Sequence, residues 1–200
     1  PDAAWVRRAR WDALTPKQAL EELMKEEKGL QETATLAKTL VPLEQELAGE
    51  HLAKQLQGFI PLIYTSTHNG ALGNCWKIKF NETGKIPAFA NVFPELNHNE
   101  MNGFQAKPHP EKLPNNFACV LLKDSMDHPR ILKRMAVLEK LYRDRGVPVY
   151  PIQLSGKNVF DKIFSSLILA DWTAFYTAKL YGLAPEGAPM VEEFKKLIGK

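Results

Sequence analysis

The sequence predicts an α/β protein: a three-layer α/β/α sandwich around a parallel sheet of four or five strands, with an N-terminal helical arm. Two observations predict this fold. From residue 59 onward, apolar runs of strand length alternate with amphipathic helical segments. These runs are apolar throughout, as strands are when helices cover both faces of a parallel sheet. Because the pattern is helical from residue 16 to residue 56 and changes after Gly58, we expect an N-terminal segment and helical arm at 1–56 and the sheet domain at 57–200.

Residues 16–56 are expected to form two amphipathic helices. Thr15-Pro16 offers an N-cap followed by a proline in the first turn. Leucine then recurs at helical spacing among many Glu, Gln and Lys residues, for example at Leu20, Leu23, Leu43 and Leu47. We interpret these helices as packing elements rather than as a catalytic unit.

The sheet domain is expected to begin with an apolar strand at 59–64, which runs into the polar residues 65–67. A helix at 71–80 and a strand at 86–92 follow, and then an amide-rich loop. The alternation continues with a fully apolar strand at 117–122. The remaining elements are expected at 147–154 (strand), 161–181 (helix) and 190–198 (helix).

One further helix has clear boundary signals. Asp127-His128-Pro129 opens it and Gly146 closes it. Its apolar residues recur on one face, at Ile131, Met135, Leu138 and Leu141. Such a face is expected to pack against the sheet.

Composition limits the classes of partner. Of the 200 residues 44% are apolar, which is enough to build a core. The net charge of +3 arises from interleaved Lys and Glu rather than from the basic stripe of a nucleic-acid-binding protein. No apolar run approaches the length of a membrane span. The only two cysteines, Cys75 and Cys119, lie in apolar contexts and fit a reducing compartment. We expect a cytoplasmic protein without nucleic-acid or membrane partners.

The candidate site lies in residues 80–100. Glu82 stands at the end of the helix expected at 71–80. The strand expected at 86–92 is followed by the segment Phe93-Pro94-Glu95-Leu96-Asn97-His98-Asn99-Glu100. We expect Glu82 and His98 to point into a common crevice at the carboxyl edge of the sheet, where open α/β folds bind ligands. A carboxylate and an imidazole in one site can move protons at neutral pH.

Each candidate has a structural alternative. A glutamate at a helix end is usually solvated, and His98 could be a core or loop residue. No second His or Cys stands at a metal-ligand spacing from His98, which argues against zinc. The hydroxyls of Thr65, Ser66 and Thr67 could hold an anion at a helix N-terminus, but capping of that helix is favoured.

Three segments together resemble a known family. They are Trp76-Lys77-Ile78-Lys79-Phe80-Asn81-Glu82, Lys85-Ile86-Pro87-Ala88-Phe89 and the stretch 93–100. Their order and spacing resemble the second sugar-isomerase (SIS) domain of the bifunctional phosphoglucose/phosphomannose isomerases. The resemblance runs from about residue 47 to residue 200 and includes Asp127-His128-Pro129-Arg130-Ile131. It departs at Ala170, where the family usually has glycine before the aspartate.

The resemblance implies that the sheet domain at 57–200 is an SIS domain, the C-terminal half of an aldose–ketose isomerase of carbohydrate metabolism (glycolysis and gluconeogenesis). The enzyme would interconvert glucose 6-phosphate or mannose 6-phosphate with fructose 6-phosphate through a cis-enediol, with no cofactor and no metal. Glu82 is implied as the base that moves a proton between C2 and C1. His98 is implied to assist ring opening in the site of the partner subunit of a homodimer, and Lys195 to reach the sugar. The implied substrate-binding residues are Thr65, Ser66, Thr67 and Asn81.

The chain lacks a counterpart of the family's N-terminal SIS domain, which binds the phosphate and precedes the catalytic arginine. Arg8 and Arg10 are the candidate matches for that arginine. Two alternatives to a catalytic half therefore stay open. One is a non-catalytic phosphosugar-binding SIS module, and the other is a structural half that needs a separate N-terminal domain.

Overall fold

Four parallel strands form one sheet in the order β2-β1-β3-β4. The computed structural model describes residues 16–39, 42–105 and 116–199; Arg8, Arg10 and the side chains of Leu20 and Leu23 lie outside its description. The strands are β1 (Ile60–Ser66), β2 (Phe89–Phe93), β3 (Phe117–Asp124) and β4 (Val149–Leu154).

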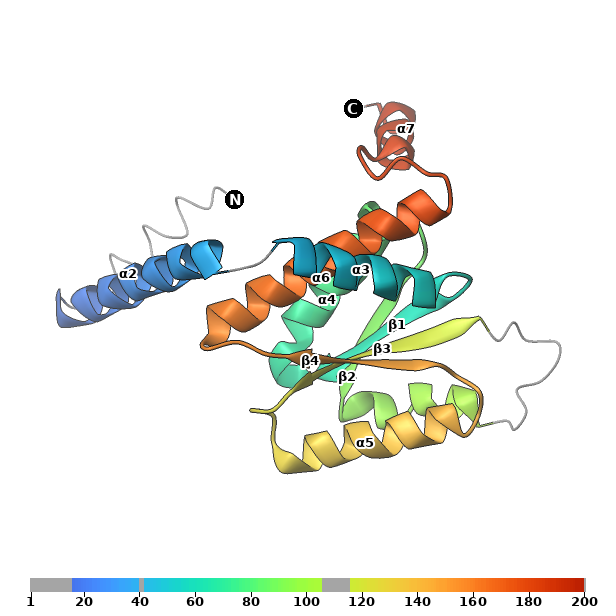
Figure 1. The fold of residues 1–200 in the computed structure, drawn as a ribbon, viewed down its shortest axis with the longest axis horizontal. Coiled ribbons are helices and arrows are strands. Elements are labelled where there is room, and N and C mark those ends of the chain that lie inside the picture. Colours follow the sequence, from blue (N-terminus) through green and yellow to red (C-terminus); the bar gives the residue numbers. More distant parts are fainter. Residues whose placement is uncertain (1–15, 40–41, 106–115, 200) are drawn as a thin grey trace.

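Helices cover both faces of this sheet (Figure 1). One face carries α3 (Pro42–Leu56), α4 (Gly70–Glu82) and α6 (Val159–Leu180). The other face carries α5 (Pro129–Arg143) and the short 3-10 helices η2 (Glu95–Asn97) and η3 (Glu100–Phe104). Two further helices, α2 (Pro16–Thr39) and α7 (Pro189–Leu197), lie outside these layers. The predicted three-layer α/β/α sandwich with a parallel sheet is confirmed.

The two central strands alternate their side chains between two hydrophobic cores. Ile63 of β1 packs with Trp76 and Phe80 of α4 in one core, whereas Tyr64 packs with Met135 of α5 in the other. These five side chains are fully buried, so both faces of β1 are sealed from water. This double burial explains why the sequence of β1 is apolar rather than alternating.

One element boundary differs informatively from the expected one, and one opening signal is explained in detail. The second strand begins at Phe89 rather than at residue 86, because Pro87 cannot donate to a ladder and the Ile86 N–H bonds the Phe80 carbonyl instead. His128 is itself the N-cap of α5, since its Nδ1 accepts from the N–H of Arg130 at 3.1 Å.

Helix α3 packs closely along α6. A Cβ on Gly49 would lie 2.4 Å from the Cβ of Trp172, so the two backbones approach more closely than a larger residue allows. Leu52 and Leu56 are buried, whereas Leu43 and Leu47, expected to share an apolar stripe, are 62% and 56% exposed. α3 thus contributes to the core, and the division at residue 56 between an arm and a sheet domain remains a prediction. Among the described helices, none combines the length and apolarity needed to cross a bilayer.

Candidate functional site

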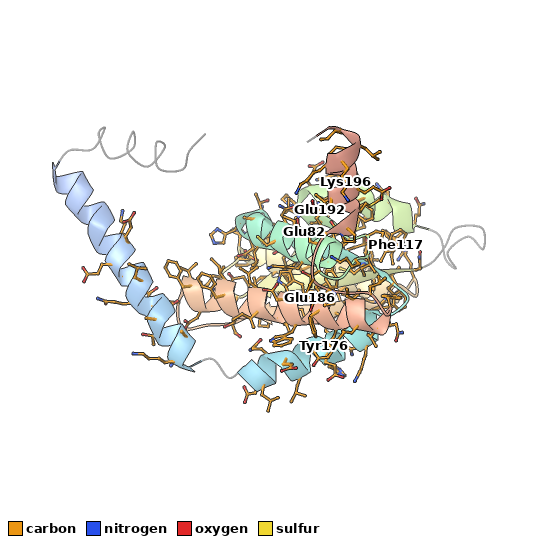
Figure 2. All side chains as sticks on the ribbon, turned by 90° about the horizontal axis from the view of Figure 1, so that it is seen from above. Glu82, Phe117, Tyr176, Glu186, Glu192 and Lys196 are labelled. Carbon is orange, nitrogen blue, oxygen red and sulfur yellow. The ribbon has the colours of Figure 1, made fainter. Side chains whose placement is uncertain are left out.

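Glu82 lines a cavity that has a volume of about 880 Å³. It is the last residue of α4 and its side chain is exposed. Figure 2 shows it close to α7. One wall comes from the end of α4 and the segment after it; the other comes from α7, through residues including Met190, Glu193, Phe194 and Leu197. The exposed carboxylate of Glu82 therefore lines the same cavity as the mainly apolar wall from α7.

The chain turn after Glu82 is fixed by local contacts. The side-chain amide of Asn81 donates to the Ile86 carbonyl at 3.0 Å. A Cβ on Gly84 would lie 2.7 Å from the Phe80 carbonyl oxygen, so glycine is needed for this turn. The ammonium group of Lys85 donates to the carbonyls of Glu82 and Gly187, which ties the end of α4 to the segment before α7. Glu82 is thus presented from a well-anchored helix end.

Lys195 lies on α7 but is not among the residues that line this cavity. Its ammonium group forms an ion pair with Glu192 at 2.7 Å, one turn away on the same helix. The lysine that lines the cavity is Lys85, which the sequence analysis did not single out. Lys85 lies within one of the segments that carry the family resemblance, and this position could have marked it as a candidate site residue.

His98 lies elsewhere, in the loop that follows β2. It is exposed and lines a second cavity of about 560 Å³ together with residues of η3 and α5. The cationic side chains of this second cavity are Arg130, Lys133 and Arg134, and its floor contains Leu138. The two cavities share no lining residue.

The expectation that Glu82 and His98 share a crevice within one chain is therefore wrong. The reason is topological. A helix that joins two parallel strands runs back to the edge from which the first strand started. Glu82 ends such a helix and lies at the amino edge of the sheet, whereas His98 follows the carboxyl end of β2.

The hydroxyls expected to bind substrate are engaged inside the chain. Ser66 caps η1 (Thr67–Asn69), because its Oγ accepts from the N–H of Asn69 at 3.3 Å. Thr67 donates to the Phe93 carbonyl at 2.8 Å. The structure argues against a substrate contact for Thr65, which is 1% exposed and donates to the carbonyl of Leu122. Ser66 thus has a capping role, but for η1 rather than for α4, whose N-cap Asn69 makes no side-chain capping bond.

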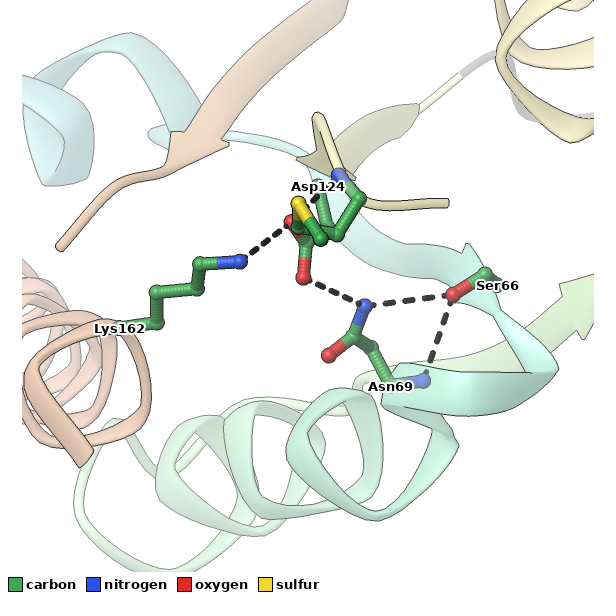
Figure 3. A network of polar contacts seen from close by, with 5 residues as sticks. Ser66, Asn69, Asp124 and Lys162 are labelled. Atoms are coloured by element: carbon green, nitrogen blue, oxygen red, sulfur yellow. Dashed lines mark hydrogen bonds and ion pairs between the residues drawn. The ribbon is translucent and has the colours of Figure 1, made fainter. Parts of the chain in front are cut away.

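An ion pair lies at the carboxyl ends of β1 and β3 (Figure 3). Asp124 is 3% exposed, and its carboxylate accepts from Lys162 at 2.8 Å, from the Met126 N–H at 3.0 Å and from Asn69 at 3.5 Å. Burial acts to raise the pKa of Asp124, but the hydrogen bonds from Lys162 and Met126 outweigh it and hold the pKa below its ordinary value. These charges lie at the carboxyl edge of the sheet, the edge at which open α/β folds bind ligands.

No local sequence pattern indicates this pair, because Asp124 and Lys162 come from different elements and meet only in the fold. Within the described residues, no three side chains of His, Cys, Asp or Glu gather as metal ligands would.

Comparison with known proteins gives a consistent result. The family model described as "Bacterial phospho-glucose isomerase C-terminal SIS domain" matches residues 45–198. A protein named bifunctional phosphoglucose/phosphomannose isomerase from Aquifex aeolicus is 31% identical over 165 residues, which are 82% of this chain and 50% of that protein. One of the same name from Caldicellulosiruptor bescii is 32% identical over 161 residues, 80% of this chain and 46% of that protein. The chain spans about half the length of these relatives.

Solved structures share the fold. A glucose-6-phosphate isomerase like protein from Thermus thermophilus superposes with a TM-score of 0.56 at 20% identity, over 74% of this chain and 46% of that one. The C-terminal domain of glucosamine-fructose-6-phosphate aminotransferase from Francisella tularensis superposes with a TM-score of 0.56 at 13% identity, over 88% of this chain and 49% of that one. At these identities the similarity concerns the fold alone.

Proposed function

Because the chain belongs to the family of bacterial phosphoglucose isomerase C-terminal SIS domains, we propose that it is the C-terminal half of an aldose–ketose isomerase. The enzyme interconverts glucose 6-phosphate or mannose 6-phosphate with fructose 6-phosphate. The observation that supports this most directly is the placement of Glu82, an exposed carboxylate on an anchored helix end that lines a cavity of about 880 Å³.

Glu82 is the general base in this proposal. Its carboxylate takes the proton from C2 of the open-chain aldose, and the electrons of that C–H bond form the C1=C2 bond of a cis-enediol while the carbonyl oxygen O1 takes a proton from water. The protonated Glu82 then returns its proton to C1, and the O2 hydroxyl gives its proton back to water as the carbonyl forms at C2. One carboxylate that reaches both carbons suffices for the two transfers.

A cation near the enediol would stabilise the negative charge that develops on its oxygens. Lys195 retains this role as a proposal, and to reach the sugar it must leave its ion pair with Glu192. Lys85 lines the cavity, but its ammonium group already donates hydrogen bonds to two backbone carbonyls. Asn81, on the same helix end, is proposed to contact the substrate.

His98 acts in ring opening, and it acts in the site of the partner subunit of a homodimer. The separation of the two cavities supports this proposal, since Glu82 and His98 of one chain line different cavities. Two-fold association is the commonest closed symmetry, and it would form two equivalent shared sites.

The phosphate is assigned to an N-terminal SIS domain that pairs with this chain. This assignment is supported by Thr67, whose hydroxyl donates to the Phe93 carbonyl, and by Ser66, which is 3% exposed. The free thiols of Cys75 and Cys119 fit a reducing compartment, and we place the enzyme in the cytoplasm.

The test is a coupled assay for fructose 6-phosphate, run with this chain alone and with the N-terminal half added. Turnover on addition, abolished by Glu82→Gln in this chain, is the expected result. Binding of the sugar phosphate by the pair without turnover would instead indicate a non-catalytic phosphosugar-binding module. Co-purification of the two halves with neither binding nor turnover would indicate a structural half.

A further inference from the structure

The segment that carries His98 is attached to the sheet through one carboxylate. Glu100 stands two residues after His98, at the start of η3. Its Oε1 accepts from the Tyr64 hydroxyl at 2.5 Å, and its Oε2 accepts from the side-chain amide of Asn91 at 2.5 Å. Tyr64 on β1 and Asn91 on β2 are register partners, so their side chains leave the same face of the sheet. Both oxygens of Glu100 are therefore held by neighbouring strands.

The Tyr64 hydroxyl and the Asn91 amide both donate to Glu100, and a carboxylate offers each of them its own oxygen acceptor. Tyr64 is 0% exposed, and its burial, together with Tyr142 and Glu100 beside it, raises its pKa, so the hydroxyl stays a donor. The amide of Asn91 cannot turn over, because its Oδ1 already accepts from the N–H of Val92 at 2.8 Å. A glutamine at position 100 keeps only one oxygen acceptor: its NH₂ group would either meet the NH₂ group of Asn91 or take the place of the acceptor to which the Tyr64 hydroxyl now donates.

The attachment continues to His98 through the backbone. The N–H of His98 donates to the carbonyl of Glu95 at 2.9 Å, and Asn102 donates to the carbonyl of His98 at 3.0 Å. The N–H of Glu100 donates to the side chain of Asn99. The backbone around His98 is thus fixed on both sides, while its imidazole stays exposed over the second cavity.

We propose that Glu100 is a positioning residue: it holds the His98 segment on β1 and β2 in the geometry that His98 needs. The role in catalysis rests on the proposed function, whereas the structural attachment does not. The side chain of Glu100 acts through His98 and does not itself contact the sugar.

The attachment is tested by hydrogen–deuterium exchange on the full chain, comparing wild type with Glu100→Gln and Tyr64→Phe. The expected result is about ten- to hundredfold faster exchange at amides of residues 95–104, the range that corresponds to loss of a hydrogen bond to a charged group. Tyr142→Phe is the matched control, because it removes a phenolic oxygen 3.4 Å from that of Tyr64 but no bond to Glu100. Wild-type exchange at 95–104 in both test variants, with exchange elsewhere unchanged, would overturn the attachment.

The catalytic consequence is tested in the isomerase assembled with the N-terminal half. Glu100→Gln should lower kcat for the cyclic sugar about tenfold or more with KM unchanged, and it should cause no further loss in a His98→Ala background. An equal loss in that background would overturn a role through His98. If the wild-type assembly shows no isomerisation, the proposed function fails, and the exchange experiment still decides whether Glu100 fastens the segment.

Discussion

Glu82 and His98 lie at opposite edges of one parallel sheet, although they are close in the sequence. Glu82 ends α4, which has returned to the amino edge, and β2 then crosses the sheet again before His98. Each residue lines its own cavity. A reaction that uses both groups on one sugar therefore requires two chains.

This relationship predicts complementation between two defective variants. Glu82→Gln and His98→Ala subunits, co-expressed and purified as mixed dimers with the N-terminal half present, should regain activity. With sites shared between subunits, a mixed dimer has one site with both defects and one intact site. Purified mixed dimers should then give about half of the wild-type turnover, and an unfractionated random mixture, in which about half of the dimers are mixed, about a quarter.

The control is the purified mixed dimer of one subunit that carries both substitutions and one wild-type subunit. That arrangement leaves each shared site with one defect, so this dimer should be far less active than the first mixed dimer. Activity in the control dimer, and none in the first mixed dimer, would mean that each subunit builds its own site.

The ion pair of Asp124 and Lys162 is expected to matter more for stability than a surface pair. Lys162→Met would leave the carboxylate of Asp124 buried and without its cation, which typically costs roughly 3–5 kcal/mol of unfolding free energy. Lys79→Met is the matched control: Lys79 pairs with Asp171 at 2.6 Å, but their side chains are 35% and 49% exposed, and such pairs contribute about 1 kcal/mol or less. Urea unfolding at pH 7 measures both, and equal costs would contradict this ranking.

The lowered pKa of Asp124 also predicts a pH dependence. A carboxyl group whose pKa is lower in the folded state stabilises the fold fully above its unfolded value of about 3.9. This contribution is lost as the pH falls through the folded pKa. The difference in unfolding free energy between wild type and Asp124→Asn should therefore be constant from pH 7 to about pH 5 and shrink in stronger acid. If the difference grows on acidification, folding raises the pKa of Asp124 instead of lowering it, which would contradict this prediction.

Gly49 is expected to be intolerant of alanine, because the added Cβ would meet the Trp172 Cβ at 2.4 Å and the Thr173 nitrogen at 2.9 Å. Overpacking of this kind costs roughly 1–3 kcal/mol, more than alanine gains in a helix interior. Gly103→Ala is the control, since nothing lies within 4 Å of a Cβ there. A Gly49→Ala protein with an unchanged melting temperature would show that α3 can move away from α6.

The order of strands and helices could be predicted from the sequence, because buried parallel strands are continuously apolar and helices are periodic. The buried face of α3 could be predicted only in part from its leucines, because Leu52 and Leu56 are buried but the other two are not. Leu43 and Leu47 are exposed, while Gly49 and Ala53 face the interior. Small residues permit the close approach to α6, and a pattern based on large apolar residues does not reveal them.

The candidate site, too, could be predicted from the sequence only in part. The residues Glu82 and His98 could be identified from their segments, but their separation follows from the direction of α4. The contacts of Glu100 require the register that pairs Tyr64 with Asn91, which only the folded sheet provides. Charges far apart in the sequence, such as Asp124 and Lys162, meet for the same reason.

The central claim is that Glu82 is the base that removes the C2 proton, and Glu193 is the other carboxylate among the described residues lining its cavity. Glu82→Gln keeps the shape and most hydrogen bonding of the side chain but removes the base. General-base assistance is typically worth roughly 10²–10⁴-fold. Binding of the sugar phosphate should be largely retained, because we assign the phosphate contacts to the N-terminal half.

The most direct measurement is exchange of the C2 proton with solvent deuterium, followed by mass spectrometry, in the isomerase assembled with the N-terminal half. We predict that Glu82→Gln slows this exchange about 10²-fold or more, while Glu193→Gln slows it far less. Exchange at the wild-type rate in Glu82→Gln, or its loss in Glu193→Gln alone, would show that another group is the base.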